Sequence, residues 1–411
     1  MEKVVITGMG VATPLGWDLK SFWSGLVEGK SGVQLLEGED FQGLPSRIGA
    51  LVNPQAVLDF IGKKGARRIS LASQLALLAA EEAIGMARLD AVGETARREV
   101  AIVIGSSIGG FQASDPIFRD YYVDGRQSAF AIPMSMNSGP AANVSIRYGF
   151  GGPQMTADAA CASSAHSVGY VFNMIRFGLI DMAVTGGADS PFARGVMQAW
   201  CNLRVLSERN DDPPTACRPF SADRDGLVLG EGAGIMVVES ERSAIRRGVP
   251  ILAEIKGYGA SSDGHHITQP SQDGPVRAMQ KALADAGIGP GRIDHINAHA
   301  TGTQWNDKNE TAAIKQVFAE QAYKIPVIGT KAALGHSIGA SGALELISSV
   351  LSLQNQSIPP TINHHIPDPD CDLDYVTEGY RDVALTHILS NSFAFGGSNG
   401  ALVVGRYTDG A

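Results

Sequence analysis

One cysteine of the chain has the surroundings of a nucleophile. Cys161 lies in Asp158-Ala-Ala-Cys-Ala-Ser-Ser-Ala-His-Ser, between an apolar segment at residues 153–157 and a predicted helix through residues 167–177. This spacing predicts a thiol at a helix N-terminus, where the helix dipole and free backbone N–H groups lower the pKa of a thiol. Most cysteines are small buried hydrophobic residues, and the other three, Cys201, Cys217 and Cys371, lack this context.

Two histidines are the candidate proton partners of this thiol, because a thiolate nucleophile needs a proton partner and groups that stabilise an oxyanion. His299 lies in the run Ile296-Asn-Ala-His-Ala-Thr-Gly-Thr, and His336 lies in Leu334-Gly-His-Ser-Ile-Gly. Each histidine follows a predicted strand, and α/β sheets place their ligands at the carboxyl ends of strands. We therefore expect Cys161, His299 and His336 to lie together.

The adjacent histidine pairs His265-His266 and His364-His365 are not expected to bind a metal. Both pairs lie in loops rich in Gly, Pro or Asn. Neighbouring side chains on an extended chain point to opposite sides, so such pairs chelate poorly. We expect surface or structural roles for them, and the sequence predicts no metal site.

Further polar and aromatic residues lie near the two candidate histidines. They comprise a lysine, a glutamate, an i, i+3 pair of carboxylates, two threonines and two phenylalanines in a Gly-rich loop: Lys331, Glu345, Asp307, Glu310, Thr301, Thr303, Phe393 and Phe395. The alternative roles are compensation of a helix dipole for the carboxylate pair, helix capping for the threonines and core packing for the phenylalanines.

A sheet is needed to position these residues, and the chain alternates short apolar runs with helical patterns. Residues 3–8, 100–105, 181–186 and 235–238 are typical of buried strands, and residues 67–87 have apolar side chains at helical spacing. Strand–helix alternation predicts βαβ units and a buried, mostly parallel sheet.

The order of elements repeats within the chain. Ile6-Thr-Gly-Met-Gly resembles Ile255-Lys-Gly-Tyr-Gly, 249 residues later, and three further strands follow each copy in the same order. We infer two duplicated α/β halves that meet near residue 250, with the extra length of the first half at residues 111–150 and 192–230. Chance similarity of two α/β domains is the alternative.

Composition excludes several classes of protein. The 411 residues have a net charge of −9, which does not suit general nucleic-acid binding. The chain shows no signal peptide and no apolar run of about 18 residues, so no secretion and no membrane span are expected. Four cysteines without paired spacing favour a reducing cytoplasm. The 49 glycines occur in short groups that predict tight turns and close backbone approach.

Four motifs in sequence order resemble one family. They are D-x-A-C-x-S-x-x-H, N-A-H-x-T-x-T, T-K-x-x-x-G-H-x-x-G-A and N-S-F-x-F-G-G, and together they are similar to the β-ketoacyl-acyl-carrier-protein synthases over essentially the whole chain. The resemblance implies the thiolase-like α/β fold, with two duplicated βαβαβαββ halves in five layers, αβαβα. Residues 1–250 would be the half with the nucleophile and the insertions, and residues 251–411 the half with both histidines.

The resemblance implies an acyltransferase that performs a decarboxylative Claisen condensation. An acyl group on Cys161 would react with malonyl-carrier protein to give β-ketoacyl-carrier protein and CO₂, with His299 and His336 driving decarboxylation and Lys331 supporting them. Glu345, Asp307, Glu310 and the gating residue Phe395 would assist. Thiolases use a second cysteine, and none lies near Gly396-Gly397. A non-catalytic partner that sets chain length and a cysteine thioester hydrolase are the alternatives.

The resemblance also assigns binding residues. Thr301 and Thr303 would grip the phosphopantetheine arm of the carrier, and no other cofactor is implied. Pocket walls would come from Ile108, Trp200, Phe393 and, across a subunit interface, Ala131 and Ile132. Because the carrier protein is acidic, local basic residues would dock it, and the candidates are Lys63, Lys64, Arg67, Arg68 and Arg204. A solvated helix face is the alternative for that group.

One loop departs from the usual fatty-acid pattern. Fatty-acid elongation enzymes usually show H-G-T-S-T after the first histidine, whereas this chain has His299-Ala-Thr-Gly-Thr. The following run, Asn306-Asp-x-x-Glu-Thr-Ala-Ala, is closer to the ketosynthase subunits of type II polyketide synthases, which often pair with a paralogue that lacks the cysteine. The pathway, and whether the dimer is homomeric or heteromeric with a chain-length-factor-like subunit, stay open at this point.

Overall fold

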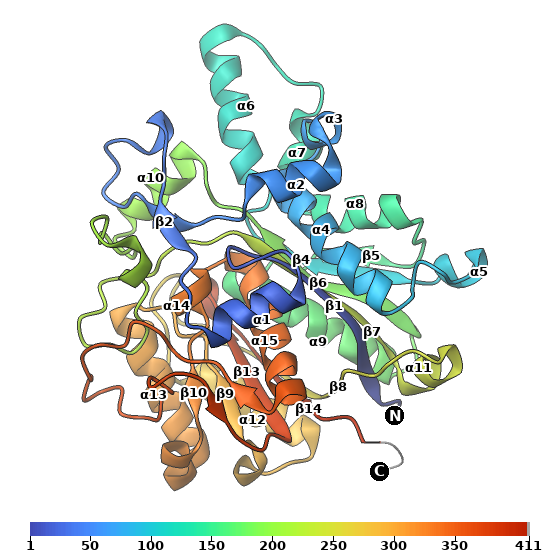
Figure 1. The fold of residues 1–411 in the computed structure, drawn as a ribbon, viewed down its shortest axis with the longest axis vertical. Coiled ribbons are helices and arrows are strands. Elements are labelled where there is room, and N and C mark those ends of the chain that lie inside the picture. The colour runs from blue at the N-terminus through green and yellow to red at the C-terminus, as the bar shows by residue number, and fades with distance from the viewer. Residues whose placement is uncertain (409–411) are drawn as a thin grey trace.

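One ten-stranded sheet runs through the molecule. The computed structural model describes residues 1–408, and the strands follow the order β10-β9-β13-β14-β8-β1-β7-β6-β4-β5 (Figure 1). Their bounds are β1 (Val4–Ala12), β4 (Ala101–Gly105), β5 (Gln154–Met155), β6 (Met182–Asp189), β7 (Gly232–Ser240), β8 (Ala253–Ser262), β9 (His295–Asn297), β10 (Val327–Ile328), β13 (His387–Phe393) and β14 (Ser398–Gly405).

The strand order is symmetric about the middle of the sheet. The first half of the chain supplies β5, β4, β6, β7 and β1, and the second half supplies the equivalent series β10, β9, β13, β14 and β8. The halves join where β1 pairs antiparallel with β8, with Val4 opposite Ile255 and Ile6 opposite Ala253. The predicted duplication is therefore confirmed as a fold of two βαβαβαββ units, while the division at residue 250 stays a prediction.

Helices form three layers that alternate with the two half-sheets in an αβαβα arrangement. α4 and α8 cover the outer face of the first half-sheet and α12, with α13 beside it, covers that of the second (Figure 1). α9 and α15 lie between the half-sheets and contact strands of both. The bounds are α4 (Leu71–Met86), α8 (Gly139–Tyr148), α9 (Ser163–Arg176), α12 (Asp273–Ala286), α13 (Gln304–Phe318) and α15 (Ser341–Asn355).

Two Gly-x-Gly pairs allow an outer helix to lie close to its strand in each half. A Cβ atom at Gly10 would lie 2.1 Å from the carbonyl oxygen of Ala79 on α4, and a Cβ atom at Gly259 would lie 2.0 Å from that of Ala278 on α12. No side chain fits at such distances, so only glycine permits this approach. The repeated sequence pattern therefore has the same packing cause in both halves.

The duplication also repeats one strained turn. The 3₁₀ turn Ala160–Ala162 precedes α9, and the 3₁₀ turn Ile338–Ala340 precedes α15. Ala160 and Ile338 both have a left-handed backbone, with φ of 48° and 45°. Residues with a Cβ atom rarely adopt this conformation, and such outliers concentrate at functional sites. Equivalent strained turns thus lie at the N-termini of the two central helices.

The helix predicted over residues 67–87 begins later than expected, at Leu71. The hydroxyl of Ser70 accepts a hydrogen bond from the backbone N–H of Ser73 and caps the helix there. Residues 67–70 are not helical, and the separate short helix α3 (Lys63–Ala66) ends just before them. The apolar pattern therefore predicted the helix correctly, and the cap decided its first residue.

The extra residues of the first half lie mostly outside the duplicated core, and α6 projects from the body of the molecule (Figure 1). The remaining bounds are α1 (Leu19–Val27), α2 (Pro54–Ile61), α5 (Glu94–Arg97), α6 (Phe111–Asp124), α7 (Ala131–Ser135), α10 (Arg194–Asn202), α11 (Glu241–Arg247), α14 (Lys331–Leu334), β2 (Val33–Leu35), β3 (Ile48–Ala50), β11 (Ser357–Ile358) and β12 (Arg381–Asp382).

Gly259→Ala is predicted to destabilise the protein by about 3 kcal/mol, because the new methyl group would push β8 away from α12. Thermal unfolding measures this change. Gly289→Ala is the matched control, since a Cβ atom there meets nothing within 4 Å, and we expect its midpoint to match that of the parent. Equal midpoints for the two variants would contradict the packing explanation.

Candidate active site

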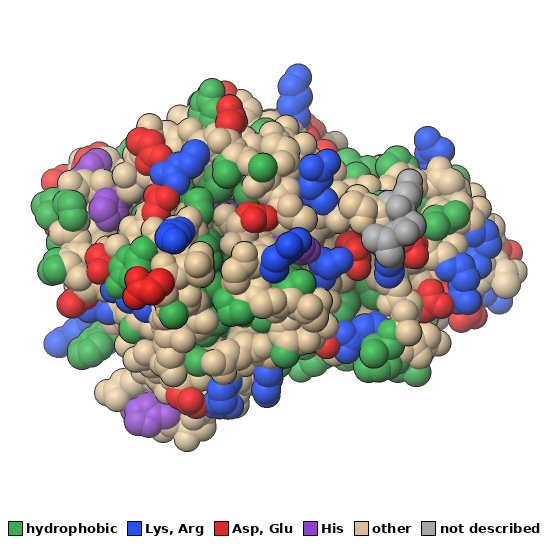
Figure 2. All heavy atoms as spheres, turned by 90° about the horizontal axis from the view of Figure 1, so that it is seen from below, with side chains coloured by type: hydrophobic (Ala, Val, Ile, Leu, Met, Phe, Trp, Pro, Cys, Tyr) green, Lys and Arg blue, Asp and Glu red, His purple; other side chains and the backbone are tan. Residues whose placement is uncertain are grey.

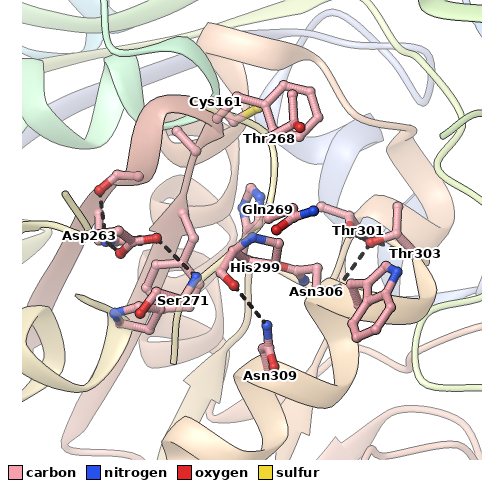
Figure 3. A pocket seen from close by; sticks show the side chains of 18 of the residues that line it. Cys161, Asp263, Thr268, Gln269, Ser271, His299, Thr301, Thr303, Asn306 and Asn309 are labelled. Carbon is pink, nitrogen blue, oxygen red and sulfur yellow. Dashed lines mark hydrogen bonds between the residues drawn. The ribbon is translucent and has the colours of Figure 1, made fainter. Parts of the chain in front are cut away.

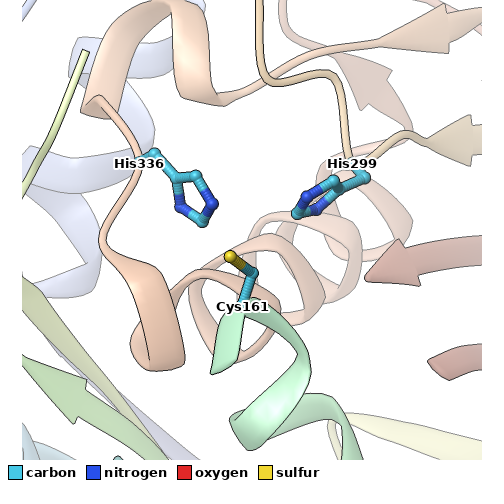
Figure 4. Close-up of side chains that lie close together, drawn as sticks. All are labelled: Cys161, His299 and His336. Carbon is cyan, nitrogen blue, oxygen red and sulfur yellow. The ribbon is translucent and has the colours of Figure 1, made fainter. Parts of the chain in front are cut away.

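The structure brings Cys161, His299 and His336 together at the centre of the molecule. The Sγ atom of the cysteine and one ring nitrogen of each histidine all lie within 4.8 Å of one another, and all three residues are buried (Figure 4). The two imidazole rings are nearly perpendicular, with centroids 5.5 Å apart. The thiol comes from the first half of the chain and both histidines come from the second, so the site needs both halves.

Cys161 is the middle residue of the strained turn before α9. Burial raises the pKa of its thiol to about 11, although the charge of Lys331 and the backbone N–H groups of Phe395 and Cys161 itself act in the opposite direction. The lowered pKa predicted from the helix N-terminus is therefore wrong in net direction, because desolvation outweighs the donors. Those two N–H groups, directed at one sulfur, are placed to stabilise an oxyanion beside it.

Hydrogen bonds fix the tautomers of both histidines. The Nδ1 atom of His336 accepts a hydrogen bond from the backbone N–H of Ile338 at 3.1 Å, and Nδ1 of His299 lies 3.2 Å from the ammonium group of Lys331. Burial and the charge of Lys331 lower the pKa of both rings well below the ordinary value. Both rings are thus neutral, and each carries its proton on Nε2, which makes each a hydrogen-bond donor toward the cavity.

Lys331 is buried and uses each of its three N–H bonds. Its Nζ atom donates to Nδ1 of His299, to the carbonyl oxygen of His299 at 2.6 Å, and to the carboxylate of Glu345. Lys331 begins α14 and Glu345 lies in α15, and both side chains are almost completely inaccessible. A buried ammonium is tolerated only with a paired charge and satisfied donors, and this arrangement supplies both.

The carboxylate pair after His299 holds the backbone of the histidine loop. Glu310 accepts hydrogen bonds from the backbone N–H groups of His299 and Ala300, both at 2.8 Å, and Ala300 has a left-handed φ of 43°. Asp307 accepts hydrogen bonds from the backbone N–H groups of Phe220 and Gly302. The two carboxylates therefore fix a strained loop, which compensation of the helix dipole alone would not require.

Arg224 is a buried residue to which the sequence analysis assigned no role. Its guanidinium group donates to the carbonyl oxygens of Thr303 and Gln304 at 3.1 and 3.2 Å and to the carboxylate of Asp368 at 2.7 Å. These bonds anchor the segment between the histidine loop and α13. A basic residue in a charged, Gly-rich run was the only available signal, and that signal is typical of exposed loops as well.

Asp189 is a second buried residue to which the sequence analysis assigned no role. At the end of β6, its carboxylate accepts hydrogen bonds from the backbone N–H groups of Ser107 at 3.1 Å, Ile108 at 3.2 Å and Gly339 at 2.8 Å. Burial raises the pKa of Asp189 to about 7 against these donors. The carboxylate thereby joins a loop of the first half to the loop that follows His336 in the second.

A cavity of about 450 Å³ connects the thiol to the surface (Figure 3). Thr301 and Thr303 line it, with their hydroxyl oxygens 2.9 Å apart. Phe393, Phe395 and Trp200 line its inner part, where the rings of Trp200 and Phe395 are stacked with centroids 6.0 Å apart. The ring of Phe393 lies 5.9 Å from that of His299.

Other predicted binding residues lie away from this cavity. Ile108 packs in the apolar cluster behind Trp200. On α7, Ala131 is buried and Ile132 is 67% exposed, and within one chain neither residue lines the cavity. The predicted basic docking residues are all exposed, namely Lys63, Lys64, Arg67, Arg68 and Arg204.

Cys161, His299 and His336 are residue types that zinc sites also use. The hydrogen bonds of the two histidines, however, oppose metal binding. A metal at Nε2 would require the ring proton to move to Nδ1. In both rings Nδ1 already faces a donor, the ammonium group of Lys331 or the N–H of Ile338. The arrangement therefore favours donation of two hydrogen bonds to a substrate oxygen over coordination of a cation.

Two ketosynthase domains account for most of the chain. Residues 1–244 match the family described as β-ketoacyl synthase, N-terminal domain, and residues 252–365 match β-ketoacyl synthase, C-terminal domain. The chain is 40% identical over 410 residues to the 3-oxoacyl-[acyl-carrier-protein] synthase 2 of Staphylococcus aureus (strain N315), with 99% of each chain covered.

Solved ketosynthase structures have the same fold. The ishigamide ketosynthase/chain length factor superposes with a TM-score of 0.92 at 34% identity, and covers 99% of this chain and 100% of its own. A ketosynthase in a type II polyketide acyl-carrier-protein complex superposes with a TM-score of 0.89 at 30% identity and the same coverage.

The fold and the site define a condensing enzyme of the thiolase-like class, an acyltransferase. The chain belongs to the β-ketoacyl synthase family, and its activity is that of a β-ketoacyl-acyl-carrier-protein synthase. Within residues 1–408, none of the helices combines the length and apolar character needed to cross a membrane.

Glu345→Gln is predicted to destabilise the protein by about 3–5 kcal/mol, because it leaves the buried ammonium of Lys331 without its counter-charge. The double variant Lys331→Met/Glu345→Leu is expected to regain most of this stability while losing activity. Thermal unfolding tests both variants, with the exposed Glu37→Gln as control. A Glu345→Gln midpoint equal to that of the control would overturn the assigned role of the ion pair.

Proposed function

We propose that Cys161 holds the acyl chain as a thioester and that His299 and His336 drive decarboxylation of malonyl-carrier protein, in type II polyketide or fatty-acid chain elongation. The observation that carries this proposal is the convergence of two neutral Nε2–H donors on one buried thiol. A cysteine hydrolase would need a base that activates water, and two donors of this kind do not supply one. A non-catalytic partner would not need the three groups together.

Acylation comes first in the proposed sequence. The sulfur of Cys161 attacks the carrier-bound acyl thioester, the bond from the acyl carbon to the carrier sulfur breaks, and the carrier thiol leaves with the proton. The backbone N–H groups of Cys161 and Phe395 stabilise the oxyanion. Their contact with the sulfur also stabilises the thiolate against the large effect of burial.

Condensation then consumes malonyl-carrier protein. The Nε2–H groups of His299 and His336 donate to the thioester oxygen while the bond to the carboxylate carbon breaks, which releases CO₂ and leaves an enolate. The enolate carbon attacks the acyl carbon, and the Cys161 sulfur departs as the new C–C bond forms. Lys331 positions His299, and Glu345, Asp307 and Glu310 hold Lys331 and the histidine loop.

The partners we propose are an acidic acyl carrier protein and a second ketosynthase chain. Two observations support docking of the carrier by basic residues: the side chains are exposed, and within residues 1–408 none of them forms an ion pair. The residues are Lys63, Lys64, Arg67, Arg68 and Arg204. The lower face, in contrast, mixes both signs of charge (Figure 2). Relatives carry the carrier protein in their names, and one solved neighbour is a complex with a carrier.

The second ketosynthase chain would cover an apolar face. Large exposed side chains concentrate on α6, α7 and α8, among them Tyr122, Ile132 and Ile146, and the edge strand β5 has no second neighbour within the described chain. Such a surface favours a partner. A copy of this chain and a chain-length-factor-like paralogue both suit it. A copy would bring its own Ala131 and Ile132 to the pocket, and a paralogue would bring the residues at the matching positions.

No cofactor beyond the phosphopantetheine arm is proposed, because the arm, one thiol and two donors suffice for the chemistry. The thiol must stay reduced, which suits a cytoplasmic enzyme, and all four cysteines are free.

Cys161→Ala is predicted to abolish both acyl-enzyme formation and condensation, as measured by intact mass and by product formation. His336→Ala should still be acylated but should release CO₂ from malonyl-carrier protein about 100- to 1000-fold more slowly, the effect of removing one oxyanion donor. Cys201→Ala is the control and should behave as the parent. An acyl adduct that persists in Cys161→Ala, or unchanged CO₂ release by His336→Ala, would refute these roles.

The decarboxylation rate is predicted to stay constant from pH 8 down to about pH 6. Burial lowers the pKa of His299 and His336 well below 6.5, so the neutral donors persist as the pH falls. Burial also raises the pKa of Glu345 and Asp189 to about 7, and a constant rate therefore also requires that protonation of these carboxyls leaves the two donors in place. A histidine of ordinary pKa would lose half of its neutral form near pH 6.5. Initial rates of CO₂ release across this range distinguish the two cases.

A further inference from the structure

An exposed tryptophan lies at the mouth of the cavity that contains the reacting thiol. Trp305 is 75% exposed and Ile267 is 70% exposed, yet both line the same cavity as the buried residues Cys161, His299 and His336. Trp305 comes from the first turn of α13 and Ile267 from the loop at residues 263–271. The cavity therefore has a buried, reactive inner end and an outer rim that exposes apolar surface to water.

The lining of this cavity combines reactive, polar and apolar side chains. In addition to the thiol and the two imidazoles, the hydroxyl groups of Thr301 and Thr303 line the cavity. The side-chain amides of Asn306 and Asn309, both on α13, line it as well. Trp305 and Ile267 supply the large exposed apolar side chains of the lining. A ligand that reaches the thiol through this cavity needs a reactive end, then amide or hydroxyl groups, and then an apolar group near the surface.

The backbone that carries Trp305 is held rigidly although its side chain is exposed. The buried guanidinium of Arg224 donates to the carbonyl oxygens of Thr303 and Gln304, the two residues directly before the tryptophan. The hydroxyl of Thr303 caps α13 by accepting from the N–H of Asn306. Little conformational freedom of the backbone is therefore lost when a ligand packs on the indole, which favours binding.

We propose that Trp305, together with Ile267 in the lining of the same cavity, binds the gem-dimethyl group of the phosphopantetheine arm. The arm has a thioester, two amides and then a carbon bearing two methyl groups before its phosphodiester, which suits a cavity with a buried reactive end, polar side chains in its lining and an exposed apolar rim. Tryptophan supplies a large, rigid apolar face for such a group. This assignment rests on the proposed function, since it takes the carrier arm as the ligand that reaches Cys161.

Three acyl donors with the same acyl group test the assignment. An N-acetylcysteamine thioester lacks the gem-dimethyl group, a pantetheine thioester has it, and the carrier-bound thioester adds the protein. For Trp305→Ala we expect KM for acylation of Cys161 to rise about tenfold with pantetheine and carrier donors, the change that burial of two methyl groups gives. With the N-acetylcysteamine donor we expect no change in KM. For each of the three donors, kcat of the Trp305→Ala variant should equal that of the parent.

Two further variants serve as references. Trp305→Phe should keep most of the affinity, because a phenyl ring can still cover the methyl groups. Trp17→Ala removes a tryptophan that is 46% exposed and lies outside the cavity, and it should behave as the parent with every donor.

Each other outcome overturns the assignment. A KM change confined to the carrier-bound donor would show contact with the carrier body instead, an equal loss with all three donors would show a general disturbance of the site, and no change would show a bystander. Failure of the proposed function has a different signature, because the parent protein would then form no acyl adduct on Cys161 with any of the three donors.

Discussion

The buried ammonium of Lys331 is the interaction on which the rest of the active site depends. Its three bonds set the position of His299 and the tautomer of that ring. Burial, and after it the charge of Lys331, lowers the pKa of both histidines and keeps them neutral. The charge is tolerable only because Glu345 lies opposite on a central helix. The chemistry of the site is therefore tied to the packing of α14 and α15, and neither can shift without exposing an unpaired charge in the core.

Much of the fold and the grouping of Cys161, His299 and His336 could be predicted, because their signals are local. Gly-x-Gly at the end of an apolar run, a cysteine at a helix start and histidines just past strands can each be read within about ten residues. Arg224 and Asp189 could not be assigned roles, because their partners lie about 80 and 150 residues away. The pKa of Cys161 was predicted in the wrong direction because a helix start is visible in sequence, whereas the depth of burial is not.

Backbone strain is concentrated in the segments that hold the reacting groups. Ala160 precedes the thiol, Ala300 follows the first histidine and Ile338 lies two residues after the second, and all three have a positive φ. The carboxylate of Glu310, from outside the turn, accepts a hydrogen bond from the backbone N–H of Ala300. Ala160 and Ile338 each begin a turn that leads directly into a central helix. Strained residues of this kind persist only where the surrounding structure over-determines them, so the site is preorganised before any substrate arrives.

The two copies of the turn before the central helices differ in their middle residue. Its middle residue is Cys161 in the first copy and Gly339 in the second, where a Cβ atom would lie 2.5 Å from the carboxylate of Asp189. The second copy therefore admits no side chain, and the duplicated framework offers a single covalent attachment point. Under the proposed mechanism, one thiol at the end of one cavity cannot hold both reactants at once, so the first carrier would have to depart before the second arrives, which is the order of ping-pong kinetics.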